Sequence, residues 1–161
     1  MDARKCISYL TIELRGSIPE ELRPPMGTHV YGCDICQDVC PWNGKSPIIE
    51  QEEFQPRTFA DQMGNENSLF SPRLHWLLNM SEKEFREVFR GSPVKRTKWR
   101  GLVRNACIAA GNSATSANTE AYERLKAPLQ RLANLDDPII KESALWALSR
   151  IQELGKQAQP L

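Results

Sequence analysis

Apolar residues recur at helical spacing through the second half of the chain, which predicts a run of amphipathic helices. The clearest case is residues 94–110, where one face is apolar and Gly111 marks the end of the pattern. Upstream, residues 72–79 predict a short helix, and Ser81 with Glu84 forms a capping-box pattern that opens a second one. The apolar face of the long helix consists of Trp99, Leu102, Val103, Ala106 and Ala110.

Two further helices are expected at the C-terminal end. One covers residues 119–134 and is expected to kink at Pro128. The other begins with a cap at Asp137, followed by a first-turn proline, and is expected to reach residue 154. Paired helices with this Asp-Pro start are typical of HEAT-like repeats, so residues 71–161 predict a HEAT-like helical domain. The last helix is expected to bury Ala144, Leu145, Leu148 and Ile151.

The first part of the chain carries shorter patterns. Residues 7–14 are apolar and fit a strand or a helix equally well. Residues 17–20 (Ser-Ile-Pro-Glu) resemble a capping box, so a short helix is expected there, ended by Pro24-Pro25. Residues 46–70 have no clear period and contain several Pro, Gly, Asn and Gln residues, which indicates a connector.

Composition and charge place the chain among ordinary globular proteins. Its 161 residues are 40% hydrophobic and 25% charged, with a net charge of +1. No apolar run approaches the roughly 20 residues that a membrane span needs. The charged residues 1–5 are followed by no apolar stretch of signal-peptide type. We therefore expect a cytoplasmic protein of mainly α class.

Four of the five cysteines lie near the N-terminus and indicate metal or redox chemistry, as clustered thiols do in a reducing compartment. Cys33, Cys36 and Cys40 form the run C-x2-C-x3-C-P, and Cys6 precedes them. This run is the end of the C-x2-C-x2-C-x3-C-P pattern of bacterial ferredoxins, whose last cysteine ligates the other of two clusters. Residues 1–45 therefore predict half of a two-[4Fe–4S] ferredoxin-like lobe built of short α/β elements.

A structural zinc site with the same four thiolates is the alternative that the sequence leaves open. Zinc sites seldom carry the x3-C-P ending, and this favours iron–sulfur ligation. Cys107 is of a different kind because it lies between Ala106 and Ile108 in the long helix. It is expected to be a buried, inert thiol.

The number of thiolates does not complete two clusters. Cys6, Cys33 and Cys36 could give three ligands to one [4Fe–4S] cluster, and Cys40 could give one to a second. One ligand of the first cluster and three of the second are then missing. The chain is therefore expected to lack a complementary N-terminal portion.

Three blocks of the sequence resemble epoxyqueuosine reductases closely: residues 2–13 together with 16–19, residues 31–43, and residues 96–105. Their order and spacing match over nearly the whole chain. The resemblance implies an oxidoreductase that reduces epoxyqueuosine to queuosine at the wobble position of tRNA, using cobalamin and two [4Fe–4S] clusters. Since the family continues upstream of Met1, we expect a truncated product, a split gene or a mis-called start, inactive by itself.

The resemblance also implies cofactor ligands, partners and an oligomeric state. Cys6, Cys33 and Cys36 match the ligands of one cluster, Cys40 matches a ligand of the other, and Ser8 matches a position on the cobalamin side. The implied partners are a tRNA with a GUN anticodon carrying epoxyqueuosine and an electron donor. The intact enzyme is expected to be a monomer.

A basic cluster in residues 90–104 contains no acidic residue and predicts contact with the tRNA backbone. The alternative is a solvated cationic helix face. Trp99 shares the spacing of the core residues, which favours packing over base stacking. A non-catalytic tRNA-binding module with a zinc site, or a degraded gene, are the competing interpretations. The expected tRNA-binding residues are Arg15, Lys95, Arg96, Lys98, Arg100 and Arg104.

Overall fold

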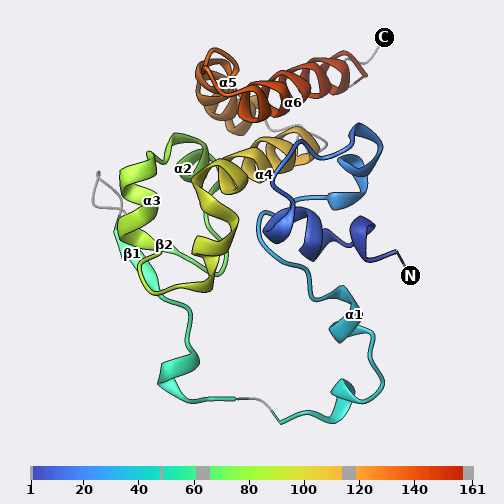
Figure 1. Ribbon diagram of the computed structural model, residues 1–161, viewed down its shortest axis with the longest axis vertical. Helices are drawn as coiled ribbons and strands as arrows, with labels where there is room; N and C mark the ends of the chain where they lie inside the picture. The colour runs from blue at the N-terminus through green and yellow to red at the C-terminus, as the bar shows by residue number, and fades with distance from the viewer. Residues whose placement is uncertain (1, 48, 61–65, 114–118, 158–161) are drawn as a thin grey trace. The chain divides into compact units, whose positions relative to one another are not determined.

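The computed structural model describes residues 2–47, 49–60, 66–113 and 119–157, and these are mainly helical, as predicted (Figure 1). The chain divides into two compact units. Unit 1 comprises Met1–Gly32 and Leu74–Leu161, and unit 2 comprises Cys33–Arg73. No helix among the described residues combines the length and the apolar composition that crossing a membrane requires.

Five α-helices form the body of unit 1. Helices α4 and α6 pack against each other, α5 packs on α6, and α2 contacts both α4 and α5. The capping predictions at Ser81 and Asp137 are confirmed. The Ser81 hydroxyl accepts the backbone N–H of Glu84 at 3.2 Å, and Asp137 Oδ1 accepts the N–H groups of Ile139 and Ile140 at 3.1 Å. The helices are α2 (Leu74–Asn79), α3 (Glu82–Val88), α4 (Lys98–Ser113), α5 (Thr119–Ala133) and α6 (Pro138–Gln157).

The N-terminal segment of unit 1 is a series of single helical turns. Its apolar stretch, which fitted strand or helix, forms the π-helix η2 (Tyr9–Glu13). The expected capping box at residues 17–20 is wrong, because Ser17 donates its hydroxyl hydrogen bond to Glu142 on α6 instead. A short helical turn does follow at Glu20–Leu22, and it ends before Pro24, where the next turn begins. The remaining turns are η1 (Ala3–Lys5), η3 (Glu20–Leu22) and η4 (Pro24–Met26).

Helix α4 starts later than the apolar period predicted and is buried on more than one face. The 3₁₀ helix η7 (Pro93–Thr97) occupies the expected first turn, and Lys98 between η7 and the rest of α4 has a positive φ of 61°. Every residue from 101 to 111 is buried, since the N-terminal segment and α6 both pack on this helix. A Cβ at Gly111 would meet the Trp146 ring at 2.8 Å, so glycine allows α4 and α6 to approach closely.

The buried stripe of α6 differs from the prediction at two of its four positions, since Leu148 is only half-buried and Leu145 is exposed. Leu145 is 50% exposed, whereas Ala147, which was not expected in the core, is fully buried. Ala144 and Ile151 are buried as predicted. Helix α6 packs against both α4 and α5, so the residues that it buries lie on two adjoining faces and not along one apolar stripe. The HEAT-like repeat itself stays a prediction.

Unit 2 contains short helical turns and one small hairpin. Strands β1 (Thr58–Ala60) and β2 (Glu66–Ser68) pair antiparallel, with Thr58 opposite Ser68. Three-residue strands are too short to show an alternating pattern, and the sequence therefore predicted only a connector here. The helical elements are α1 (Ile35–Asp38), η5 (Asn43–Lys45) and η6 (Glu52–Phe54).

An ion pair links the N-terminal segment to α6 and gives a pH-dependent prediction. The Arg23 side chain is buried, pairs with Glu142 and lies over the Trp146 ring at 5.6 Å. Hydrogen bonds from Ser17 and then from Arg23 hold the pKa of Glu142 below its usual 4.5. The ionised Glu142 carboxylate therefore contributes its full stabilisation above the usual carboxylate pKa of 4.5. This contribution is lost as the pH falls through the lowered pKa of the folded state.

Glu142→Gln removes this ion pair and is expected to lower the free energy of unfolding by about 1 kcal/mol at pH 7. The effect is small because the carboxylate is half-exposed and solvent screens its charge. The difference from wild type should shrink steadily below the usual carboxylate pKa. Urea unfolding between neutral and acidic pH measures it. Glu87→Gln, on the exposed face of α3, is the control and should change little at either pH. If Glu142→Gln lowers the free energy of unfolding equally at all pH values, the ionised carboxylate is not the source of the stabilisation.

Candidate functional site

Three of the candidate metal ligands lie in and around the first turn of unit 2. Cys33 precedes α1, Cys36 lies within it, and Cys40 follows its C-terminal cap. The backbone N–H of Cys40 donates to Gln37 O at 3.2 Å, and its carbonyl accepts from Asn43 N at 3.0 Å. Cys36 is exposed, while Cys33 and Cys40 are half-buried. The short turn therefore presents three thiols at or near the surface of this unit.

The fourth candidate, Cys6, lies in unit 1 between η1 and η2 and is exposed. Hydrogen bonds from the backbone N–H groups of Tyr9 and then Ser8 lower the pKa of its thiol. The Ser8 hydroxyl contributes to the same shift. Backbone donors aimed at a sulfur favour the thiolate, which is the form that binds metals.

The chemistry of these thiols fits a metal or cluster ligand set. None of the five cysteines forms a disulfide. Cys107 is fully buried, and burial raises the pKa of its thiol, as expected for an inert core residue. Within the described ranges no three His, Cys, Asp or Glu side chains are gathered as a metal centre. The assignment of Cys6, Cys33, Cys36 and Cys40 as ligands therefore stays a prediction.

The interpretation of Arg104 as a tRNA-binding residue is wrong, because this side chain is buried and serves the fold. Its guanidinium donates to the carbonyl oxygens of Leu10 at 2.6 Å, Leu14 at 2.8 Å and Gly16 at 2.6 Å. It also donates twice to Asn105 Oδ1. Burial, followed by the positive charge of Arg15, lowers the pKa of Arg104 to about 10, so it stays charged at neutral pH.

Asn105, the neighbour of Arg104 on α4, completes the same buried network. Its amide donates to Thr11 O and Val30 O, both at 2.8 Å. Thr97 Oγ1 also donates to Thr11 O, at 2.9 Å. These hydrogen bonds from α4 and η7 thus hold in place the π-helix η2, which follows Cys6 in the sequence.

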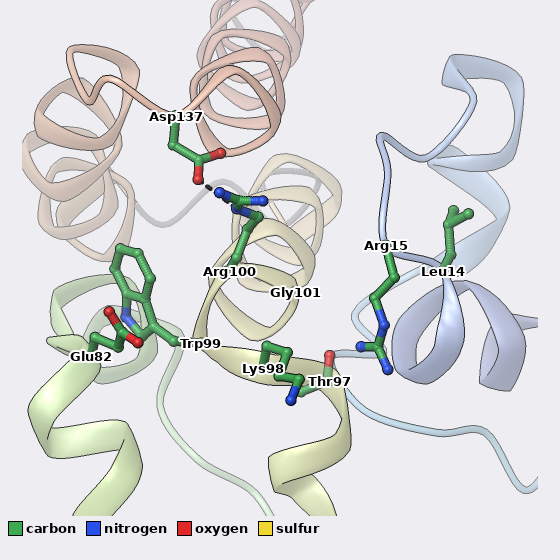
Figure 2. Close-up of a pocket in the computed structure, with 9 residues that line it drawn as sticks. All are labelled: Leu14, Arg15, Glu82, Thr97, Lys98, Trp99, Arg100, Gly101 and Asp137. Atoms are coloured by element: carbon green, nitrogen blue, oxygen red, sulfur yellow. Dashed lines mark hydrogen bonds and ion pairs between the residues drawn. The ribbon is translucent and has the colours of Figure 1, made fainter.

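A surface pocket of about 290 Å³ lies at the start of α4, within unit 1 (Figure 2). Three cations line it, namely Arg15, Lys98 and Arg100 (Figure 2). Trp99 is half-buried and donates its indole N–H to Met80 O at 2.8 Å, which supports the core interpretation of this ring. The lining residues are Leu14, Arg15, Glu82, Thr97, Lys98, Trp99, Arg100, Gly101 and Asp137.

Two of the predicted tRNA-binding arginines have carboxylate partners that are distant in sequence. Arg96 pairs with Glu13 of η2, and Arg100 Nε lies 2.5 Å from Asp137 Oδ2 (Figure 2). Arg15 donates to the carbonyl of Arg96 at 2.6 Å. The acid-free local sequence did not reveal these pairs because the folded chain supplies the acids from other elements. The exposed lysines Lys95 and Lys98 have no carboxylate partner among the described residues.

Lys98 adopts a backbone conformation that is unusual for a side-chain-bearing residue. Its φ is +61° and its ψ is 162°, a region used almost only by glycine. Such strain costs on the order of 1–3 kcal/mol and is concentrated at functional sites. Among the cations that line the pocket, Lys98 is therefore the strongest candidate for a functional residue.

Known proteins resemble this chain both in its cysteine-bearing segment and over nearly its whole length. Residues 1–43 match the family model of a 4Fe-4S double cluster binding domain. The epoxyqueuosine reductase of Francisella cf. novicida (strain Fx1) is 42% identical over 151 residues, which covers 93% of this chain. The chain is similar to part of the epoxyqueuosine reductases. It spans 38% of the length of that relative.

Solved structures of epoxyqueuosine reductases share the fold. One, determined with an epoxyqueuosine-modified tRNA-Tyr stem loop, has a TM-score of 0.73 and 27% identity, covering 99% of this chain and 41% of that chain. The enzyme from Bacillus subtilis also has a TM-score of 0.73, with 29% identity, covering 98% of this chain and 40% of that chain. The resemblance seen in the three sequence blocks is confirmed.

Proposed function

We propose that this chain supplies half of the iron–sulfur ligands and the tRNA-contacting helices of an epoxyqueuosine reductase, an oxidoreductase that converts epoxyqueuosine to queuosine in tRNA. One observation carries the proposal: the C-x2-C-x3-C-P run lies within the segment that matches a double-cluster domain. That segment belongs to a chain with about two-fifths identity to epoxyqueuosine reductases. We expect the reaction to take place in the cytoplasm, where tRNA is modified.

The proposed ligands divide between two clusters. Cys6, Cys33 and Cys36 would hold one [4Fe–4S] cluster, and Cys40 would supply one ligand to the other. When bound, such clusters supply one-electron transfer from an external donor, and cobalamin supplies the cobalt centre at which the epoxide is reduced. The chain's own contribution is to ligate iron and to direct the N–H groups of Ser8 and Tyr9 at the Cys6 sulfur.

Ser8 is the residue that we propose for the cobalamin side. Its side chain is half-buried, and its hydroxyl forms a hydrogen bond with the Cys6 sulfur. A hydroxyl that also reaches solvent can hydrogen-bond the amide groups at the edge of a corrin ring. Ser8 fits this role, and a cobalamin bound beside it would lie close to the proposed cluster ligand Cys6.

The tRNA contact is proposed for the exposed cations around the α4 pocket. Arg15, Lys95 and Lys98 are exposed, and Arg96 and Arg100 add charge that their carboxylate partners partly offset. Each cation that meets a phosphate releases counterions and steepens the salt dependence of binding. A tRNA with a GUN anticodon carrying epoxyqueuosine is the proposed partner.

Lys98→Gly is expected to have opposite effects on stability and on binding. It should raise the free energy of unfolding by about 1 kcal/mol, because glycine adopts this conformation without strain. It should also weaken tRNA binding and reduce the salt slope by about one. Urea unfolding and a salt titration of tRNA affinity measure the two effects.

Lys98→Ala is the matched variant, because it removes the charge but leaves the strain. It should weaken tRNA binding as much as Lys98→Gly does, without the gain in stability. Lys126→Ala, on α5 and outside the pocket, should leave both quantities near wild type. An unchanged salt slope in both Lys98 variants would remove this residue from the tRNA surface.

The direct test of the proposed function is a chimera. The segment of the Francisella relative that matches this chain is replaced by residues 1–161, and conversion of epoxyqueuosine to queuosine in tRNA is measured. We expect activity in the chimera and its loss when Cys36 is replaced by serine. A folded chimera that binds tRNA and contains iron but forms no queuosine would contradict the proposed function.

A further inference from the structure

The segment of unit 1 between Cys6 and the α4 pocket contains a rare helical turn. In η2 the backbone N–H of Leu14 donates to Tyr9 O at 3.0 Å, five residues back, where an α-helix would use the carbonyl four residues back. Such π turns are uncommon and are frequently found at functional sites. The Cys6 sulfur accepts the N–H groups of Ser8 and Tyr9, at the start of this turn. In the sequence, the π turn therefore joins a proposed cluster ligand to residues that line the pocket.

Side chains of α4 and η7 explain why this turn is wider than an α-helix. In an α-helical turn, the carbonyls of Leu10 and Thr11 would accept backbone N–H groups four residues ahead. Leu10 O instead accepts Arg104 Nη2 at 2.6 Å. Thr11 O instead accepts Thr97 Oγ1 at 2.9 Å and Asn105 Nδ2 at 2.8 Å. These donors favour the π form because it leaves both carbonyls free for them.

The π turn also sets the direction of Arg15. A change to α-helical bonding would rotate the chain after the turn by about 100°, because an α-helix has about 3.6 residues per turn. In the π form, Arg15 Nη1 donates to the Arg96 carbonyl at 2.6 Å, and Arg15 lines the same pocket as Lys98 (Figure 2). Neither Arg15 nor Lys98 has a carboxylate partner in the described part of the chain. The π turn therefore places two cations without a paired acid, from separate segments, around one pocket.

We propose that an RNA phosphate bound between Arg15 and Lys98 stabilises the π turn of η2, so that tRNA binding orders the backbone donors of Cys6. This coupling rests on the proposed tRNA contact and adds a consequence to it. A ligand shifts a conformational equilibrium through its different affinities for the two forms. A phosphate that bridges both cations binds the π form better than an α form, in which Arg15 has rotated away.

The coupling works in both directions. If RNA stabilises the π turn, then a contact that stabilises the π turn also tightens RNA binding, by thermodynamic necessity. The Thr97 hydroxyl makes such a contact, because it donates to Thr11 O. Thr97 is therefore a positioning residue: its side chain is buried, and it acts on the RNA surface through η2.

The first test is hydrogen–deuterium exchange of the full chain with and without an anticodon stem-loop RNA that has a GUN anticodon. Peptides spanning residues 4–16 contain the amides of Ser8, Tyr9 and Leu14. At an RNA concentration about ten times the Kd, their exchange should slow by about tenfold, because the RNA binds the ordered form. Peptides from α5, which contributes none of the described lining residues, are the control and should change little.

The second test is Thr97→Val, which removes the hydroxyl that bonds Thr11 O and leaves every charge in place. We expect faster exchange of residues 4–16 in the free chain and an RNA affinity lower by about two- to tenfold, the effect of one lost hydrogen bond. The salt slope of binding should stay at the wild-type value, since no contact between a cation and a phosphate is lost. Thr97→Ser keeps the hydroxyl and should restore the affinity. Far-UV circular dichroism shows whether each variant is folded.

The outcomes separate the coupling from the proposed tRNA contact. Slowed exchange of residues 4–16 beyond that of α5, with weaker binding in Thr97→Val and recovery in Thr97→Ser, supports the coupling. RNA binding that leaves the exchange of residues 4–16 unchanged, or a folded Thr97→Val chain with wild-type affinity, overturns the coupling and leaves the tRNA contact intact. A folded wild-type chain that binds no RNA overturns both.

The exchange of the wild-type chain decides the question even if Thr97→Val does not fold.

Discussion

Replacement of Arg104 by methionine is expected to lower the free energy of unfolding of the chain by about 3–5 kcal/mol. The substitution leaves the carbonyl oxygens of Leu10, Leu14 and Gly16 without their charged donor in a buried site. Each unsatisfied buried polar group costs about 1–3 kcal/mol, so several together give a large effect. Urea unfolding followed by circular dichroism measures it.

Arg100→Met is the control for this prediction, because Arg100 lies one turn earlier on the same helix. The Arg100 side chain is 55% exposed, so solvent screens its ion pair with Asp137, and screened pairs contribute at most about 1 kcal/mol. If the two variants lose similar stability, the role of Arg104 in clamping the N-terminal segment to α4 is contradicted. An unchanged salt slope of tRNA binding for any folded Arg104→Met protein would agree with its removal from the tRNA surface.

Cys36→Ser is expected to remove most of the bound iron from the reconstituted chain, by roughly tenfold or more. Cys36 lies on α1 between the two other thiols of the run, and serine is a poor ligand for iron–sulfur clusters. Iron and sulfide analysis after gel filtration, with the visible absorption of iron–sulfur charge transfer, measures the loss.

Cys107→Ala is the matched control, because it removes a cysteine that is fully buried in α4. It should keep the wild-type iron content while lowering stability by about 1 kcal/mol through the small cavity that it leaves. Iron loss of the same size in both variants would mean that the thiols of the C-x2-C-x3-C-P run have no special role.

The local patterns predicted the helical half of the chain well. Capping residues at Ser81 and Asp137 act within one turn, so their function depends on near neighbours in sequence and is readable from it. The C-x2-C-x3-C-P run is equally local, and residues 1–43 match a double-cluster model. Short-range chemistry of this kind depends little on how the rest of the chain packs.

Long-range partners explain what the sequence did not predict. The basic cluster of residues 90–104 looked free of acids, yet Glu13 and Asp137 approach it in the fold. Arg104 was grouped with its basic neighbours, although the N-terminal segment covers it with carbonyl oxygens. Lys98 was placed inside a continuous helix because apolar periodicity does not show where a single residue leaves the helical backbone conformation.

The most direct test of the central claim is metal and sulfide analysis of the chain after anaerobic reconstitution in the presence of iron, sulfide and zinc. If Cys6, Cys33, Cys36 and Cys40 are iron–sulfur ligands, the purified protein should contain iron and acid-labile sulfide in equal amounts, as [4Fe–4S] clusters require. A colourless protein with one tightly bound zinc per chain and no sulfide would contradict the account and favour a structural zinc site.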